Sequence, residues 1–178
     1  MYCIKCGFET KKKCPEGDNR ERDVCQKCGY IHYINPKIIV GVLPVDKVYD
    51  RILLCKRNIE PGYGKWTIPA GFMEINEAVE EGAKREALEE ANLKINILKL
   101  YSTYNTPSIE HVYLFYLGEI LNEDYAPMDE TSEVKLYKLD ELPWNEIAFS
   151  SVDFILRKYI DDFNDDKNFK FHSNYIVD

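Results

Sequence analysis

The stretch that decides the fold is residues 71–93, GFMEINEAVEEGAKREALEEANL. It opens close after Pro69, where a proline and a glycine lie together and disfavour a regular element, so we expect a loop first. From residue 77 to residue 91 good helix formers dominate and no proline intervenes, which predicts an α-helix. A narrow face of small residues, suited to packing against a sheet, consists of Ala83, Ala87 and Ala91, with Leu88 beyond them.

Three carboxylates late in this helix, Glu86, Glu89 and Glu90, form an acidic cluster. At 100° per residue, Glu86 and Glu90 differ by about 40° and Glu89 lies about 60° to the other side of Glu86, so all three leave one face. Like charges at this spacing repel, but gathered oxygen ligands are what Mg2+ or Mn2+ requires. The alternative is an ordinary solvated helix face, since charge runs usually face solvent.

The full spacing of the stretch favours the metal site. Its fixed residues, in order, are Gly71, Glu77, Arg85, Glu86, Ala87, Glu89, Glu90, Asn92 and Leu93. This pattern resembles the Nudix box of the Nudix hydrolases, G-x5-E-x7-R-E-U-x-E-E-x-G-U with U aliphatic. The single departure is Asn92, where the family has Gly. Asn tolerates positive φ, so we expect Asn92 to close the helix with a left-handed backbone.

The resemblance implies roles for the residues of the box. Glu86 and Glu90 should be the main ligands of a divalent ion, joined by Glu89 directly or through water. The ion would neutralise a pyrophosphate and activate a bound water. Arg85 points away from Glu90 and should hold Glu77 or a nearby carboxylate in place.

Candidate residues also lie beside and beyond the helix. Gly71 is expected to be a backbone position where a side chain would block the approach of its own carbonyl or of the substrate. A general base outside the box is common in the superfamily, and Glu130 and Glu133 are the candidates. Arg57 and Lys65 could bind phosphate, although a solvated surface is the alternative for both.

Four of the six cysteines form two C-x2-C pairs. The pairs are Cys3 with Cys6 and Cys25 with Cys28, and this spacing predicts a structural zinc ribbon with four thiolate ligands. Gly7 and Gly29 follow the pairs, where a turn benefits from positive φ. Two disulfides are the alternative, but nothing indicates an oxidising compartment.

Three further residues could extend this set. Cys14 lies in a polar segment and is expected to be a spare thiol. Cys55 lies in an apolar strand pattern and is expected in the core. His32 could be a further metal ligand, but packing is the preferred interpretation.

Composition places the chain among globular proteins. Its 178 residues, 45% hydrophobic, suit a zinc ribbon (residues 1–34) and one hydrolase domain (residues 35–178). The net charge of −8 makes nucleic acid an unexpected partner, and a small nucleotide substrate would have to be received through metal ions or a local basic patch. Without a membrane-length apolar run or a secretory leader, we expect a soluble, cytoplasmic protein. A homodimer is possible.

The remaining pattern predicts an α/β/α sandwich with a mixed sheet. Expected strands cover residues 37–45, 51–57, 94–104, 110–120 and 132–138. A final helix should run from about residue 149 to residue 163, with Ser150 or Ser151 as its cap and an apolar core-packing side. The polar and aromatic tail after residue 164 could lie over the body.

Similarity to one branch of the family extends beyond the box. The cysteine pairs, YINPK at residues 33–37, LCKRNIEP at 54–61 and AFSS at 148–151 resemble the zinc-ribbon branch that includes plant ADP-ribose/FAD pyrophosphatases. This implies cleavage of a nucleoside diphosphate linked to a second moiety, with release of AMP. NADH diphosphatases carry an S-Q-P-W-P-F-P-x-S motif that is missing here. Pro107 lies close to the position of a proline that ADP-ribose pyrophosphatases often have, and a turn that ends a strand is the alternative interpretation of Pro107. The alternatives are an NADH or dinucleoside polyphosphate hydrolase, a nucleotide sensor without catalysis, and an RNA-facing protein.

Overall fold

The computed structural model describes residues 1–176, which form two compact units divided after Pro36. The first unit is a small antiparallel sheet of β1 (Thr10–Lys13), β2 (Arg22–Cys25) and β3 (Ile31–His32). Gly7 and Gly29 take positive φ of 71° and 72° directly after the two cysteine pairs, as expected for tight turns.

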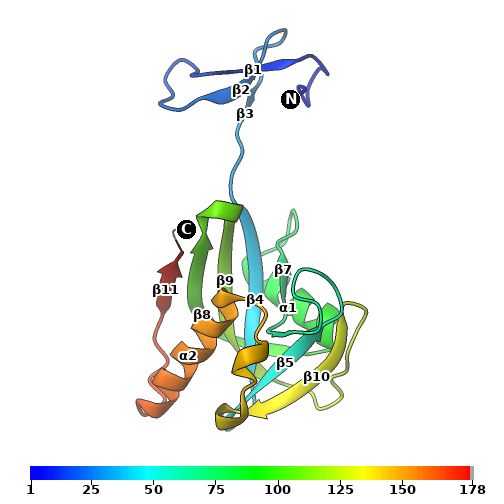
Figure 1. Cartoon of the computed structure of the whole chain (residues 1–178), viewed down its shortest axis with the longest axis vertical. Helices are drawn as coiled ribbons and strands as arrows, with labels where there is room; N and C mark the ends of the chain where they lie inside the picture. Colours follow the sequence, from blue (N-terminus) through cyan, green and yellow to red (C-terminus); the bar gives the residue numbers. More distant parts are fainter. Residues whose placement is uncertain (177–178) are drawn as a thin grey trace. The chain divides into compact units, whose positions relative to one another are not determined.

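The second unit is built on a mixed sheet (Figure 1). Its strands are β4 (Lys37–Val45), β5 (Arg51–Arg57), β6 (Trp66–Thr67), β7 (Ala70–Phe72), β8 (Ile95–Thr106), β9 (His111–Ile120), β10 (Thr131–Lys138) and β11 (His172–Tyr175). The main path is β10-β5-β4-β9-β8-β11, in which β4 with β9 and β8 with β11 are parallel and the other pairs antiparallel.

Two helices, α1 (Val79–Ala91) and α2 (Ser150–Asn164), cover opposite faces of this sheet. Successive residues of a strand point to opposite faces, and β4 shows the division directly. Val42 packs with Ala87 and Ala91 of α1, whereas the next residue, Leu43, belongs to the cluster around α2. The predicted α/β/α sandwich with a mixed sheet is therefore confirmed.

A short segment between β4 and β5 positions the candidate site. The two long strands pair only between Val45 and Ile52, and beyond that point they diverge. Residues 66–72 fill the opening, because β6 pairs with β5 and β7 pairs with β4. A Cβ on Gly41 would lie 2.5 Å from the Cβ of Ala70, so only glycine lets this segment approach β4 so closely.

The helix ends differ from the sequence expectation in two places. Helix α1 begins at Val79, so Glu77 lies in the preceding loop, where its carboxylate accepts a hydrogen bond from the Glu74 amide. Helix α2 has Phe149 at its N-cap position and no side-chain cap, so the predicted serine cap is wrong. Asn92 ends α1 with φ 50° and ψ 32°, which confirms the expected left-handed closure.

Packing also corrects two expectations. Ala83, Ala87 and Ala91 are fully buried against the sheet, but Leu88 is 46% exposed and does not extend that face. The tail adds β11, an edge strand that the sequence pattern did not indicate, parallel to β8.

Among the described residues, no helix combines the length and apolar character needed to cross a membrane.

Candidate active site

Two glutamates of helix α1 point into a cavity. Glu86 and Glu90 are 8% and 7% exposed, whereas the Glu89 side chain is 59% exposed at the rim. The three carboxylates share one side of the helix, but the sheet buries only the two that are four residues apart. The cavity, of about 720 Å³, is lined by Arg57, Ile59, Glu60, Pro61, Ala70, Gly71, Phe72, Glu74, Glu86, Glu89, Glu90, Met128, Asp129 and Glu130.

Arg85 organises the carboxylates at the edge of this cavity. Its Nε and Nη2 donate to the two oxygens of Glu77 at 3.0 and 2.9 Å. Its Nη1 donates to Glu86 at 2.7 Å and to Glu89 at 3.0 Å. Nη2 also donates to the Phe72 carbonyl at 3.1 Å, which ties α1 to β7. The expected contact between Arg85 and Glu77 is present, and it extends to two of the candidate metal ligands.

The environment of the site shifts the pKa values of its glutamates in opposite directions. Hydrogen bonds from Arg85 and from the Glu74 amide lower the pKa of Glu77 to about 2. Burial, assisted by the nearby charge of Glu86, raises the pKa of Glu90 to about 8. Burial also raises the pKa of Glu86, and Arg85 opposes that change. A buried carboxylate pair of this kind gains from a cation beside it.

Gly71 has a physical reason that the sequence did not reveal. A Cβ at this position would lie 2.3 Å from the nearer carboxylate oxygen of Glu86. Glycine therefore leaves room for the Glu86 carboxylate, whereas the sequence-based expectation was room for its own carbonyl or the substrate. The neighbouring Ala70 amide donates to Glu90 at 3.3 Å, so β7 contacts both buried glutamates.

The structure divides the candidates outside the box. Arg57 lines the cavity, and its Nε donates to the Pro61 carbonyl at 2.6 Å. Glu130 also lines the cavity, and its backbone carbonyl accepts a hydrogen bond from the Asn58 amide at 2.8 Å. Glu133 instead lies on β10, outside the lining, 3.7 Å from Lys56. Lys65 is also outside the lining, so neither Glu133 nor Lys65 is brought to the glutamates.

A second, apolar cavity of about 250 Å³ adjoins the first. The two share Arg57, Pro61, Ala70, Gly71 and Phe72. The remaining walls come from β4, β6, β9, α2 and the 3-10 turn before β9, and they are Ile39, Thr67, Ile109, His111, Tyr113, Phe115, Phe149, Ser151 and Val152. Sequence reasoning did not select these aromatic residues. The alternation of His111, Tyr113 and Phe115 on one strand face was the available signal.

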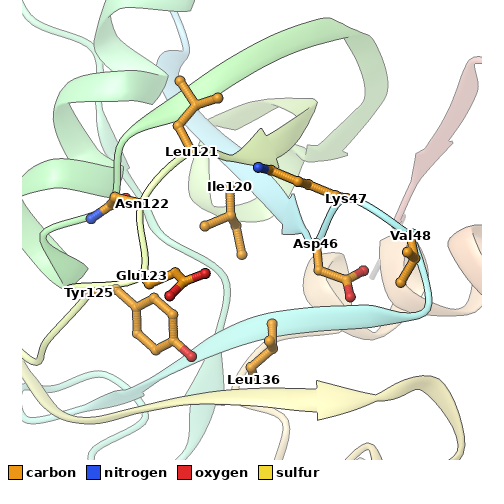
Figure 2. A pocket seen from close by; sticks show the side chains of 9 residues that line it. All are labelled: Asp46, Lys47, Val48, Ile120, Leu121, Asn122, Glu123, Tyr125 and Leu136. Atoms are coloured by element: carbon orange, nitrogen blue, oxygen red, sulfur yellow. The ribbon is translucent and has the colours of Figure 1, made fainter.

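A separate hollow of about 530 Å³ lies where the β4–β5 turn meets the end of β9 (Figure 2). Ile120, Leu136 and Tyr125 line it together with the carboxylates of Asp46 and Glu123. No residue of the 71–93 stretch lines it, so the chemistry of the box does not extend there.

The four paired cysteines form the one compact set of candidate metal ligands in residues 1–176. The Sγ atoms of Cys3, Cys6, Cys25 and Cys28 all lie within 4.8 Å of one another. Ideal tetrahedral geometry with Zn–S bonds near 2.3 Å places sulfurs about 3.8 Å apart, and the Cys3–Cys28 and Cys6–Cys25 separations are 3.7 and 3.5 Å. The four sulfurs therefore fit zinc. The glutamates do not form such a closed set, which suits an ion that keeps several waters.

The two other cysteines and His32 lie outside the thiolate cluster. Cys14 is exposed, and its thiol donates to the Asp18 carbonyl at 3.0 Å. Cys55 is fully buried, as expected, and burial raises the pKa of its thiol. His32 stands edge-on to the Tyr30 ring and is not part of the thiolate cluster.

Residues 35–159 match the family described as the NUDIX domain, and residues 1–34 match the zinc-ribbon family described as Nudix N-terminal. The chain belongs to the Nudix family. This confirms the family prediction and the Nudix hydrolase assignment. Nudix enzymes use divalent metals, and oxygen ligands around Glu86 and Glu90 fit that requirement.

Relatives agree on the Nudix family but differ in their named substrates. An ADP-ribose pyrophosphatase of Methanocaldococcus jannaschii is 30% identical over 125 residues, 67% of this chain and 71% of that protein. The NAD-capped RNA hydrolase NudC of Photorhabdus laumondii is 32% identical over 150 residues, 80% of this chain but 53% of its own length. The chain thus spans about half of that Nudix relative.

One solved Nudix structure covers almost the whole chain. A NUDIX hydrolase from Nitrosomonas europaea is 44% identical, with a TM-score of 0.91 over 98% of both chains. The name of that hydrolase specifies no substrate, so the similarity supports the fold and the family.

Proposed function

We propose that the chain hydrolyses the pyrophosphate bond of a nucleoside diphosphate linked to a second moiety, with ADP-ribose or FAD favoured and AMP released. The observation that carries this is the buried pair Glu86 and Glu90, which shares one open cavity with the single arginine Arg57. Two buried carboxylates attract divalent ions, and ions with an arginine can together receive a diphosphate.

Each residue of the cavity has a role in this proposal. Glu86 and Glu90, with Glu89 at the rim, would hold Mg2+ or Mn2+, which supplies charge neutralisation and an acidified water. Arg85 restrains Glu86 and Glu89 through Nη1, so it is a positioning residue. Glu130 replaces Glu133 as the proposed general base, because it lies in the cavity and can take a proton from the attacking water.

A second candidate is an NAD-linked substrate, either NADH or the NAD cap of an RNA. The NudC relative is named for capped RNA. The charge of the ribbon favours the RNA form, since residues 1–36 carry seven Lys and Arg side chains against five Asp and Glu, opposite to the acidic balance of the chain. Strand β1 exposes Lys11, Lys12 and Lys13 in a row. The acidic composition alone therefore does not exclude nucleic acid.

A substrate panel tests the proposal. ADP-ribose, FAD, NADH, diadenosine polyphosphates and NAD-capped RNA are each incubated with Mg2+ or Mn2+, and products are separated by chromatography. We expect ADP-ribose or FAD to show the highest kcat/KM and Glu90→Gln to lower kcat by orders of magnitude. Faster turnover of NADH or capped RNA would replace the favoured substrate. Binding without turnover by the parent would indicate a sensor and reject the hydrolase.

Two further expectations accompany the proposal. Cytoplasmic location and a homodimer both stay predictions. Sedimentation velocity of the full chain decides the second, because a dimer and a monomer of 20.9 kDa differ clearly in sedimentation coefficient.

A further inference from the structure

The loop that carries Glu130 has no regular structure of its own. This 121–130 loop connects β9 to β10 without forming a helix or a strand. Glu130 lies in a turn near its end, which the Thr131 amide closes by donating to the Met128 carbonyl at 2.8 Å. Irregular loops are the more mobile parts of a fold, so the contacts made by this loop decide where the Glu130 carboxylate lies.

The 121–130 loop supplies hydrogen-bond donors to the end of α1. The last carbonyls of a helix have no partner inside that helix. Here the Met128 amide donates to the Glu90 carbonyl at 3.2 Å, and the Ala126 amide donates to the Ala91 carbonyl at 3.0 Å. The turn that contains Glu130 is therefore linked directly to the backbone of a candidate metal ligand.

Two asparagine side chains join the same two segments. Asn92 Nδ2 donates to the Asp124 carbonyl at 2.9 Å, and Asn122 Nδ2 donates to the Asn92 carbonyl at 2.9 Å. Asn122, labelled in Figure 2, also accepts a hydrogen bond from the Lys94 amide with its Oδ1 at 2.7 Å. The end of α1 thus donates to the loop and accepts from it.

Asn92 is the position at which the sequence departs from the glycine of the Nudix box. Its φ of 50° lies in the left-handed region, which glycine adopts at least as easily. Either residue therefore closes the helix, but only asparagine has an amide that can donate to Asp124. The physical difference between the two residues at this position is one hydrogen bond to the 121–130 loop.

The position of Glu130 is electrostatically unfavourable without a cation. Burial raises the pKa of both Glu86 and Glu90, and the nearby charge of Glu130 contributes to both shifts. Like charges gathered at one cavity repel one another, so the repulsion pushes the 121–130 loop away from α1. Hydrogen bonds between the loop and the end of α1 oppose that displacement.

We propose that the Asn92 side chain holds the 121–130 loop against the end of α1 and thereby keeps Glu130 in the cavity of the glutamates. Asn92 does not line the cavity, so it acts through the loop and is a positioning residue. Its removal should let the loop move outward and weaken general-base catalysis, while the helix keeps its left-handed end. The catalytic role of Glu130 rests on the proposed function, whereas the attachment of the loop does not.

Amide hydrogen exchange of the full chain tests the attachment without turnover. In Asn92→Gly, the Ala126 and Met128 amides should exchange about two- to fivefold faster, which is the effect of one neutral hydrogen bond on a local opening. The Tyr49 and Glu110 amides close turns in other loops, so their exchange should not change.

A double-mutant cycle tests whether the attachment acts through Glu130. Single turnover of ADP-ribose or FAD, whichever is faster, isolates the chemical step at saturating Mg2+. Asn92→Gly should lower this rate about tenfold, the lower end of the loss when a residue that orients an active-site group is removed. The half-saturating substrate concentration should stay unchanged. In the Glu130→Gln background the same substitution should have no further effect, because the group that Asn92 positions is absent.

Asn76→Gly is the matched control. Asn76 is exposed and also has a positive φ, of 70°. Its replacement makes the same change at the same kind of backbone position, but outside the 121–130 loop and outside the cavity lining. Neither the exchange of Ala126 and Met128 nor the single-turnover rate should change.

The outcomes separate this inference from the proposed function. Unchanged exchange of Ala126 and Met128 in Asn92→Gly would overturn the attachment of the loop. A rate loss of equal size with and without Glu130 would overturn the positioning role. If the parent hydrolyses neither ADP-ribose nor FAD, or if Glu130→Gln is as fast as the parent, the proposed function or its general base fails. Faster exchange in Asn92→Gly would then still support the attachment.

Discussion

Replacing Glu90 with glutamine should stabilise the protein in the absence of divalent cations, although it should lower the kcat of the proposed hydrolysis by orders of magnitude. The pKa of Glu90 is raised from 4.5 to about 8, so the folded state prefers the protonated form. Burial of Glu90 therefore lowers the free energy of unfolding above pH 4.5, and this loss of stability grows until about pH 8. At pH 7 it amounts to about 3 kcal/mol. The amide removes the charge, and its oxygen can still accept the hydrogen bond from Ala70.

Thermal unfolding followed by tryptophan fluorescence measures this effect. Both tryptophans, Trp66 and Trp144, lie in the second unit, so the signal does not include the ribbon. A gain of about 3 kcal/mol should raise Tm by about 6–12 °C at pH 7 for a chain of this size. Buffers are freed of Mg2+ by dialysis rather than with a strong chelator, which would also remove zinc from the ribbon.

The pH dependence and a control variant make the result specific. The difference between Glu90→Gln and the parent should shrink as pH falls towards 4.5. Added Mg2+ should stabilise the parent more than the variant, because the ion binds the carboxylate in the folded state. Glu89→Gln, at an exposed carboxylate, should change the free energy of unfolding by no more than about 0.5 kcal/mol. Equal stability of parent and Glu90→Gln from pH 5 to pH 8.5 would refute the burial argument.

Three further predictions follow from the site and the ribbon. Gly71→Ala should place a methyl group against the Glu86 carboxylate, so the variant should fold by circular dichroism but need more Mg2+ for half-maximal activity; an unchanged Mg2+ requirement would contradict this. In Arg85→Lys, a single ammonium group cannot hold Glu77 and Glu86 together as the guanidinium does. This variant should lower kcat about 10–100-fold, and a high Mg2+ concentration should not restore it. Zinc release titrated with a colorimetric chelator should give one ion per chain and less than half of that for Cys25→Ser, whereas equal release from both would reject the thiolate site.

The local features of this protein could be read from sequence. The spacing from Gly71 to Leu93 predicted the α1 helix and the set of carboxylates, because a 3.6-residue period and short-range chemistry are properties of the contiguous chain. Asn92 closes the helix with positive φ for the same local reason. Strands β4, β5 and β9 were located within one residue, since each is apolar, β-branched and bounded by turn residues.

The tertiary structure alone decided which of these groups lie together. Glu86 and Glu90 are buried because β7 is inserted beneath them, whereas Glu89, on the same helix side, stays in solvent. Glu130 lines the cavity and Glu133 does not, because Glu130 is in the loop just before β10 and Glu133 is on the strand itself. The aromatic cavity joins segments from Ile39 to Val152. Such proximity depends on how distant segments pack, and packing is a property of the whole fold that no single stretch encodes.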